Sequence, residues 1–349
     1  MTTRALATIR KVLSIEAIPN ADSIELAHID GWQCVVRKGE FTSNQIGVFF
    51  EIDSYLPIQP RYEFLRKSSY KKLPELVGTR CEGFRLRTTK LRGALSQGLL
   101  MSMSNFPELQ GCEDQLGKDV TQILDVVLYA PPIDASLVGK VKGVVPSFIH
   151  KTHQDRIQNV PEYLDKYRDE LYEVTEKING TSMTVYYNKG GFGICGHNME
   201  FYLDTENSYI EVAKALDIEK ASRTLNKNVA IQGELAGEGI QGNPLKIKGH
   251  KFFVFDIWDI DKGRYQTEEE RSLTMGELNA LGFALDHAPK IRDAYLREFS
   301  TLEDILRFAD GNSLINKTQR REGVVFKPSV NSSIPSFKVL SNDYLLHEK

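Results

Sequence analysis

Short apolar-alternating runs, separated by turn residues, fill the first part of this chain. The runs ATIRKVLSIEAI, HIDGWQCVVRKGEF and IGVFFEIDSYLP are interrupted or followed by Gly, Asn, Asp or Pro. Several short strands divided by such residues are typical of a small antiparallel barrel rather than of helices. The pattern therefore predicts an N-terminal β-barrel.

The rest of the chain mixes two kinds of pattern. Strand patterns recur in LYEVTEKI, NVAIQGEL, HKFFVFDIWDI and REGVVFK. Helical patterns occupy residues 154–170, 207–222, 267–281 and 300–311. This mixture predicts a larger α+β domain after the barrel.

Two domains suit the length of the chain, since 349 residues are long for one domain. Residues 131–155 contain several prolines and glycines, and we predict that they form the linker. The predicted domains are residues 1–145 and residues 146–349.

Composition excludes several classes of protein. The net charge of -3 carries no global nucleic-acid signature, so any such binding must come from local patches. The four cysteines lack the CxxC spacing of a zinc site or a disulfide framework. The N-terminus has no apolar core, and no run approaches the ~20 apolar residues of a membrane span. We therefore expect a soluble intracellular protein of the cytoplasm or nucleus.

A local basic patch does occur, in the stretch RCEGFRLRTTKLRGALSQGLLM that begins at residue 80. Its cations are Arg80, Arg85, Arg87, Lys90 and Arg92, and Glu82 is the only acid near them. The i, i+2 spacing of Arg85 and Arg87 predicts that both lie on one face of a strand. Such a cluster suits a phosphate backbone, although a solvated charged hairpin is the alternative.

The stretch EKINGTSMTVYY, residues 176–187, places Lys177 at the end of an apolar-alternating run, two residues before Asn-Gly. Taken alone, this pattern favours an exposed lysine at the edge of a turn. The other reading is a nucleophilic amine, which requires that burial or a neighbouring cation lower its pKa. The nucleophilic reading therefore needs further groups elsewhere in the chain.

Candidate groups follow Lys177 in order. Glu234 ends an apolar strand just before the Gly-rich loop of IQGELAGEG. Phe253 and Phe255 share one face of the predicted strand HKFFVFDIWDI. Each feature also has a plain structural explanation, because apolar strands and their ends are ordinary core elements.

Three charged residues complete the series. Glu322 and Lys327 lie five apart in REGVVFKP, so on a strand they are expected to point to opposite sides at its two ends. Lys338 follows in SFKVLS. Individually these residues also fit a hairpin and edge-strand charges, and it is the ordered set that favours chemistry.

The ordered set resembles the covalent nucleotidyltransferases, which comprise ATP-dependent DNA and RNA ligases and mRNA-capping guanylyltransferases. EKINGT is similar to their nucleophile motif and GELAGEG to their glutamate motif. FFVFDI resembles their purine-stacking motif, EGVVFK their second carboxylate-lysine motif, and SFKVLS their terminal lysine motif. The run EKINGTSMT is most similar to the RNA ligase 2 group. The resemblance spans residues 176–340.

This resemblance implies a set of site residues. The implied catalytic residues are Lys177 as the adenylated lysine, with Glu234, Glu322, Lys327 and Lys338. The implied nucleotide-binding residues are Glu176, Ile178, Asn179, Gly180, His197, Asn198, Phe253, Phe255 and Arg156. Glu234 and Glu322 are the implied ligands, through water, of Mg²⁺ or Mn²⁺.

The chain departs from the motifs at two places. Asn179 stands where these enzymes usually have an Asp that touches the nucleotide ribose. GHNME offers His197 and Asn198 where an Arg is usual. For Arg156, a place on the surface of the predicted helix is the alternative to a contact with the β and γ phosphates.

The arrangement of domains narrows the resemblance further. Only eleven residues follow Lys338, so the barrel must precede the catalytic domain. Its sequence resembles OB modules related to tRNA-binding domains, and KTHQDRIQN, residues 151–159, is similar to the run KTDEERIQN. Both features resemble the Deinococcus-type RNA ligases, also called the RNA ligase 5 family.

That resemblance implies an α+β protein with an N-terminal OB fold and an ATP-grasp-like nucleotidyltransferase domain of antiparallel sheets with helices. It implies ATP-dependent sealing of 3′-OH/5′-phosphate nicks with RNA at the 3′-OH end, through lysyl-AMP and transfer of AMP to the 5′-phosphate. The expected partner is a nicked RNA or RNA/DNA duplex, contacted by Arg85, Arg87, Lys90 and Arg92, and the expected state is a monomer without a membrane. A guanylyltransferase, a DNA ligase and a non-catalytic nucleic-acid-binding protein are the alternatives.

Overall fold

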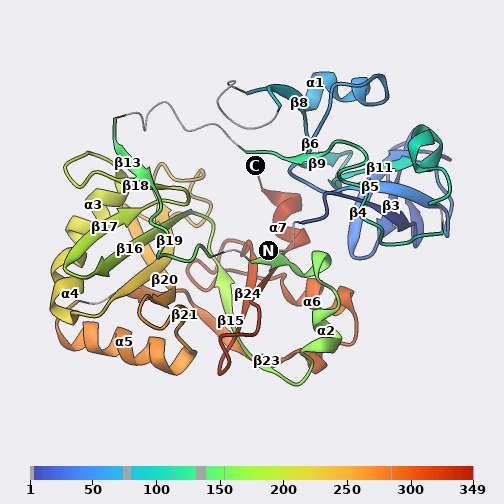
Figure 1. The fold of residues 1–349 in the computed structure, drawn as a ribbon. Coiled ribbons are helices and arrows are strands. Elements are labelled where there is room, and N and C mark those ends of the chain that lie inside the picture. The colour runs from blue at the N-terminus through green and yellow to red at the C-terminus, as the bar shows by residue number, and fades with distance from the viewer. Residues whose placement is uncertain are drawn as a thin grey trace. The chain divides into compact units, whose positions relative to one another are not determined.

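The computed structural model describes residues 4–73, 80–112, 114–130, 139–152, 154–283 and 285–348. The chain divides into two compact units, Met1–Asp134 and Ala135–Lys349 (Figure 1). Among the described residues, none of the helices has the length and apolar character needed to cross a membrane.

The first unit is built from short antiparallel strands. Their bounds are β1 Ala7–Lys11, β2 Ser14–Ala17, β3 Ile24–Ile29, β4 Trp32–Arg37, β5 Ile46–Phe50, β6 Ser54–Leu56, β7 Tyr70–Lys72, β8 Glu82–Arg85, β9 Thr88–Leu91, β10 Ala94–Gln97, β11 Leu99–Ser102 and β12 Val127–Leu128, with helix α1 at Arg66–Ser69. They form sheets in the orders β1-β5-β11, β2-β3-β4, β9-β10 and β12-β6-β8-β7. The predicted strands in this unit are therefore confirmed.

The small sheets of this unit are joined into a barrel. The side chain of Gln33 on β4 donates to the Leu95 carbonyl of β10, and the Val35 N–H donates to Ser96 Oγ, both at 3.0 Å. Trp32 lies in the barrel core, where it is 1% exposed. Alternating strand residues thus supply one apolar face to a shared interior, as a barrel requires.

The second unit contains two larger sheets. Their strands are β13 Val141–Val144, β14 Asp155–Arg156, β15 Leu171–Lys177, β16 Thr181–Asn188, β17 Gly191–Cys195, β18 Met199–Phe201, β19 Val229–Gly237, β20 His250–Asp259, β21 Arg264–Tyr265, β22 Asp286–His287, β23 Lys290–Tyr295, β24 Gly323–Pro328 and β25 Phe337–Leu340. The helices are α2 Tyr163–Lys166, α3 Ser208–Ala215, α4 Ile218–Leu225, α5 Glu268–Ala280, α6 Leu302–Phe308 and α7 Asn342–His347.

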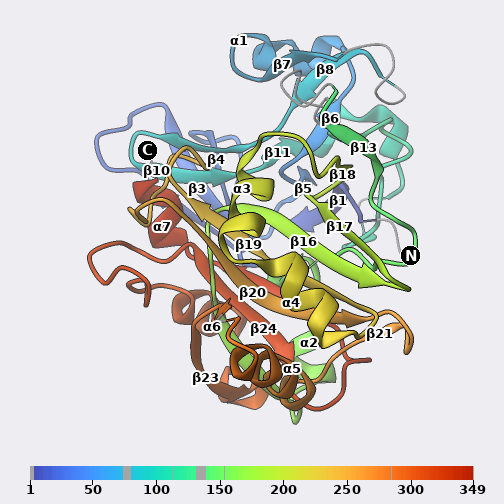
Figure 2. The same cartoon turned by 90° about the vertical axis from the view of Figure 1, so that its left-hand side faces the viewer.

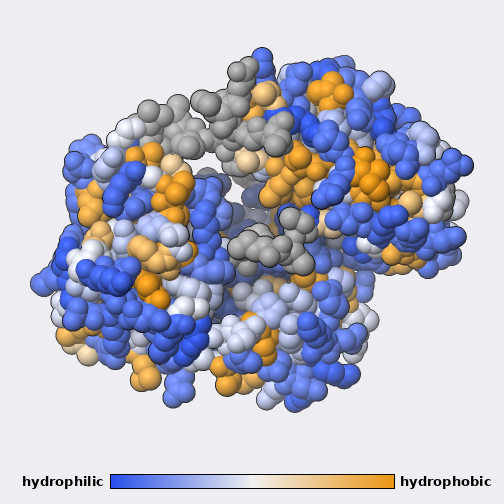
Figure 3. Space-filling model, in the orientation of Figure 1, coloured by the Kyte–Doolittle hydropathy of each residue, from blue (hydrophilic) through white to orange (hydrophobic). Residues whose placement is uncertain are grey.

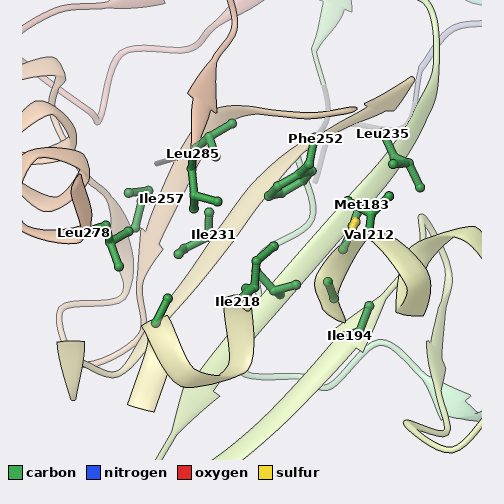
Figure 4. Close-up of a cluster of buried hydrophobic side chains, with 14 of the residues drawn as sticks. Met183, Ile194, Val212, Ile218, Ile231, Leu235, Phe252, Ile257, Leu278 and Leu285 are labelled. Atoms are coloured by element: carbon green, nitrogen blue, oxygen red, sulfur yellow. The ribbon is translucent and has the colours of Figure 1, made fainter. Parts of the chain in front are cut away.

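The eight-stranded sheet has the order β13-β18-β17-β16-β19-β20-β21, and β22 pairs with β20. Helices α3 and α4 lie along one face of it (Figure 2). Apolar side chains of these helices and of the sheet, such as Ile218, Met183 and Phe252, point toward one another and form the main core of this unit (Figure 4). The visible surface of the unit is mostly hydrophilic, with scattered hydrophobic groups (Figure 3).

The five-stranded sheet has the order β14-β25-β24-β15-β23. The rings of Phe326 on β24 and Phe337 on β25 stack in its core, with centroids 4.8 Å apart. Both rings are fully buried. This packing fixes the relative positions of the three central strands, which carry Lys177, Lys327 and Lys338.

The chain passes from one sheet to the other between β15 and β16. These consecutive strands do not pair, so the Asn-Gly turn predicted after Lys177 is not a hairpin. Gly180 lies at the crossing, where a Cβ would come within 2.4 Å of the Leu235 carbonyl oxygen. Only glycine allows the backbones to approach this closely, which places the end of β15 beside β19.

The predicted elements of this domain are mostly confirmed. The predicted helix at 207–222 is divided into α3 and α4, because Asp217 between them has φ 51°. The predicted helix at 154–170 is wrong. These residues form β14, a 3₁₀ turn at Ile157–Asn159 and the short α2, since Pro161 interrupts the segment and cannot donate the hydrogen bond that a continuous helix requires.

The predicted linker also differs from the structure. Part of it, residues 131–138 and His153, lies outside the described residues. Strand β13 pairs with β18 and β14 pairs with β25, so both belong to sheets of the second unit. The predicted boundary between residues 145 and 146 therefore falls later than the division between the compact units.

Candidate active site

A cavity of about 240 Å³ lies within the second unit, where β15 and β24 of one sheet meet β19 and β20 of the other. Its wall combines four of the five predicted catalytic residues with nucleotide-binding candidates. The lining residues are Thr152, Gln154, Thr175, Glu176, Lys177, Ile178, Ser182, His197, Glu234, Phe255, Ala288, Val325, Lys327 and Lys338.

Lys177 is the last residue of β15 and lies opposite Gly323 of β24. Its Nζ donates to Glu322 Oε1 at 2.7 Å, and the two side chains are 25% and 15% exposed. This environment does not fit the alternative of an exposed lysine at the edge of a turn, because Lys177 is held in a partly buried ion pair that faces a cavity.

The predicted opposition of Glu322 and Lys327 stays a prediction. Glu322 lies one residue before β24, which begins at Gly323. The carboxylate of Glu322 contacts Lys177, which lines the same cavity as Lys327. A Cβ at Gly323 would come within 2.2 Å of the Val339 carbonyl oxygen, so this close approach of β24 and β25 depends on glycine.

Glu234 brings a second carboxyl group to the lysine from β19. Burial raises the pKa of Glu234 to about 7, the positive charge of Lys177 opposes the shift, and the negative charge of Glu322 adds to it. These three residues therefore form one electrostatic group, in which a buried carboxyl group is poised to change its charge near neutral pH.

Lys327 lies deeper, at 5% exposure. Its ammonium donates to the Phe255 carbonyl oxygen, forms an ion pair with Asp256 at 2.9 Å, and lies 4.9 Å from the centroid of the Phe255 ring. Burial lowers the pKa of Lys327, and the Asp256 carboxylate opposes this. The lysine is thus held against the aromatic wall of the cavity.

Sequence reasoning missed the groups behind Lys327. Arg271 of α5 donates to Glu173 on β15, and its other nitrogen lies 3.9 Å from Asp256. All four side chains of this network are buried: Glu173, Asp256, Arg271 and Lys327. No sequence motif predicts this network, because its members are far apart along the chain.

Lys338 and Arg156 lie on adjoining strands. Lys338 lines the cavity from β25, and Arg156 of β14 is its register partner in parallel pairing. Arg156 therefore lies on a strand, and the alternative of a helix-surface position is wrong. It does not line the cavity.

The two candidate stacking rings have different environments. Phe253 is 5% exposed and belongs to an apolar cluster with Ile178, whereas Phe255 packs against that cluster and lines the cavity. Their shared packing confirms that they point to one face of β20. Phe255 is only partly buried and lines the cavity, so its ring is the available stacking surface.

The remaining candidates for nucleotide binding differ in whether they line the cavity. Glu176 lines the cavity, and its Oε2 accepts from the Leu314 N–H at 2.7 Å. His197 also lines the cavity, whereas Asn198 does not and instead accepts at Oδ1 from Lys151 Nζ at 3.2 Å. Asn179 lies outside the lining and donates to the Tyr344 hydroxyl of α7 at 3.0 Å.

Strand alternation in the sequence could have predicted some of the lining residues. Thr175 and Val325 each precede a predicted catalytic lysine by two residues, and they are paired in register on β15 and β24. Residues two apart on a strand share a face. Thr152 and Gln154, by contrast, lie in the segment predicted to be a linker. They belong to the run KTHQDRIQN, but that resemblance did not mark them as site residues.

The basic stretch of the first unit is less uniform than its sequence. Arg85 on β8 pairs with Asp53 at 2.9 Å and lies over the Tyr129 ring, and Arg80 pairs with Asp125. Arg87 follows the end of β8, so the prediction that it shares a strand face with Arg85 is wrong.

Two cations of the stretch occupy the β9–β10 hairpin. Lys90 and Arg92 are exposed, and Arg92 and Gly93 both have positive φ, as a two-residue type I′ turn requires. The exposed cations are therefore Arg87, Lys90 and Arg92, and Arg85 is a half-buried structural contact.

Comparisons with known proteins agree with this architecture. A model of an OB-fold domain matches residues 6–103, and a model of the RNA ligase family matches residues 170–340. No protein with a curated description matches the chain.

Solved structures of an RNA ligase from Naegleria gruberi are similar over nearly the whole chain. A mutant with AMP and Mn is 43% identical, with a TM-score of 0.81 and 98% of each chain covered. A mutant with ATP and Mn has the same identity and TM-score, over 97% of this chain and 98% of that one. The enzyme with PPi is also 43% identical, with a TM-score of 0.81 and 99% of each chain covered.

An OB-fold domain followed by a nucleotidyltransferase domain defines an ATP-dependent ligase that works through AMP. The chain belongs to the RNA ligase family, and the predicted fold class and enzyme class are confirmed.

Proposed function

We propose that this RNA ligase seals 3′-OH/5′-phosphate nicks whose 3′-OH strand is RNA, with Lys177 as the residue that carries AMP. The observation that carries the proposal is the Lys177–Glu322 pair, 2.7 Å apart, at a cavity also lined by Glu234, Lys327 and Lys338. An amine between two carboxyl groups, faced by two further cations, suits attack on a phosphate ester.

The reaction has three phosphoryl-transfer steps. Lys177 Nζ loses a proton and attacks the α-phosphorus of ATP, so that an N–P bond forms and pyrophosphate leaves. A 5′-phosphate oxygen then attacks the same phosphorus, and the N–P bond breaks as the amine regains its proton. Finally the 3′-OH loses its proton to attack the 5′-phosphate, and AMP leaves. Each step depends mainly on positioning and charge stabilisation.

Nearby residues serve these steps. Lys327 and Lys338 neutralise the α-phosphate, a task that suits the compact charge of lysine. Phe255 stacks on the adenine, while Phe253 supports it from the core. Glu176, Ile178 and Gly180 shape the base and sugar site, and Arg156, His197 and Asn198 assist on the phosphate side.

A divalent cation fits the carboxylates. Glu322 Oε2 is buried and has no hydrogen-bond partner among the described residues, and Glu234 contributes a second carboxyl group nearby. The described residues contain no cluster of three or more His, Cys, Asp or Glu that could hold a metal. These features support Mg²⁺ or Mn²⁺ held partly through water, since Mg²⁺ usually keeps several waters. Structures of the Naegleria relative contain Mn together with AMP or ATP. When bound, such an ion supplies positive charge that favours the neutral amine of Lys177.

Sealing of matched nicks tests the proposed RNA preference. Nicks that differ only in a ribose or deoxyribose 3′-OH strand should be sealed at different rates, with the RNA-ended nick preferred. Lys177→Ala should abolish sealing, and Lys189→Ala, at an exposed turn of the same unit, should not. Equal sealing of both nicks would contradict the substrate preference, and labelling of the protein from GTP alone would contradict the ATP-dependent step.

A further inference from the structure

The amide of Asn179 is held in one orientation by the C-terminal helix. Asn179 Nδ2 donates to the Tyr344 hydroxyl at 3.0 Å. The Tyr344 hydroxyl also forms a hydrogen bond with the Glu348 side chain. Because a carboxylate only accepts, the phenol proton goes to Glu348 and the phenol oxygen accepts from Asn179.

The phenol remains a fixed member of this chain of hydrogen bonds. Tyr344 is 6% exposed, and burial raises its pKa, so it keeps its proton at neutral pH. Its backbone N–H donates to Oγ of Ser341, the N-cap of α7, at 2.9 Å. Helix α7 thus holds the hydroxyl at a defined place beside Asn179, which follows Lys177 by two residues.

This orientation leaves a single acceptor unused. With Nδ2 bound to Tyr344, the remaining polar atom of the side chain is Oδ1, which is buried and has no partner among the described residues. Glu322 Oε2 is a second buried acceptor without a partner there, and its negative charge acts on Tyr344. A buried acceptor without a donor costs free energy, so this pair of oxygens calls for an O–H donor from outside the protein.

We propose that Tyr344 is a positioning residue for nucleotide binding, which directs Oδ1 of Asn179 toward an O–H donor of the bound nucleotide complex. The donor is either a ribose hydroxyl or a water of the accompanying divalent ion. An aspartate has two acceptor oxygens and needs no such orientation, whereas an asparagine presents an acceptor only when its amide is held. The inference rests on the proposed nucleotide site and adds to it a residue from α7.

The test measures ATP binding by calorimetry with Mn²⁺ present. The parent is the full-length Lys177→Ala variant, because it lacks the amine that would react with ATP. Tyr344→Phe should weaken ATP binding roughly tenfold, the usual size of a lost hydrogen bond that leaves a buried group unpaired. If a ribose hydroxyl is the donor, the loss disappears with the 2′-deoxy or 3′-deoxy analogue that lacks it. If a metal-bound water is the donor, the loss appears with Mn²⁺ and disappears in EDTA.

Two further variants keep the test decisive. Tyr187→Phe removes another Tyr–Asn hydrogen bond, between exposed residues of the same unit, and should leave binding unchanged. Glu348→Gln keeps the phenol but replaces its acceptor, so it should cause a smaller loss in the same direction, even if Tyr344→Phe does not fold. Unchanged binding in both α7 variants, or an equal loss for every nucleotide with and without Mn²⁺, would overturn the inference. Failure of the Lys177→Ala parent itself to bind ATP would instead overturn the proposed nucleotide site.

Discussion

The lysine cavity of the second unit and the basic stretch of the first unit are both clusters of charge, but they are built differently. At the cavity, Lys177, Glu234 and Lys327 come from different strands and are partly or fully buried. In the basic stretch, the cations are neighbours in sequence, and Lys90 and Arg92 are exposed on one hairpin.

The difference shows how burial changes what a charge can do. Buried charges must be paired, and they interact strongly because little water screens them. Exposed charges interact weakly and are screened by salt, but they remain available to a polyanion. Reactivity is therefore expected at the cavity and salt-dependent binding at the stretch, and the following predictions test that division in order of expected effect.

The largest effect is expected at Lys177. Lys177→Ala should lower the rate of sealing by roughly 10⁴-fold or more, since the proposed covalent nucleophile is lost. The measurement is transfer of label from α-labelled ATP to the protein, together with sealing of an RNA-ended nick. Retention of either activity would contradict a lysyl-AMP intermediate.

The next effect concerns the buried network behind Lys327. Asp256→Ala should lower the free energy of unfolding by about 3–5 kcal/mol, because it leaves a buried ammonium without its carboxylate. Glu268→Ala, which breaks the more exposed pair with Lys290, should cost less than about 1 kcal/mol. Chemical denaturation of both variants checks this, and equal losses would show that burial does not distinguish the two pairs.

A third prediction follows from the pKa of Glu234, which is raised to about 7. A raised pKa favours the protonated carboxyl in the folded state, so its contribution is present below the unfolded value of 4.5 and is lost as pH rises through 7. Relative to Glu234→Gln, the parent should therefore lose up to about 3 kcal/mol of stability over this range. Denaturation in EDTA at several pH values measures it, and a pH-independent difference would be inconsistent with the shift.

The smallest effects are expected in the basic stretch. Arg87→Ala, Lys90→Ala and Arg92→Ala should each weaken binding to a nicked duplex and reduce the salt slope by about 1, as loss of one phosphate contact does. Transfer of AMP to Lys177 should be unchanged in all three variants. Binding titrations at several salt concentrations test this, and an unaltered slope would favour the solvated-hairpin alternative.

Much of the fold follows from local patterns. The runs of the first unit became barrel strands, and the patterns around Lys177, Glu234 and Lys338 became β15, β19 and β25. The prediction of secondary structure was wrong where long-range contacts overrode a local sequence pattern. Residues 154–170 have a helical pattern, but Pro161 and pairing of β14 with β25 prevent a continuous helix.

The ordered motifs of the sequence determined the family and the charged residues that we propose for catalysis, because amines and carboxylates in that order suit lysyl-AMP chemistry. Tertiary structure decided their arrangement. Close backbone packing at Gly180 and Gly323 brings the strands together, so that Lys177, Glu234 and Glu322 interact. It also brings Asp256 and Arg271 behind Lys327 and Tyr344 to Asn179. Such contacts depend on how sheets pack across long sequence separations, which no local pattern specifies.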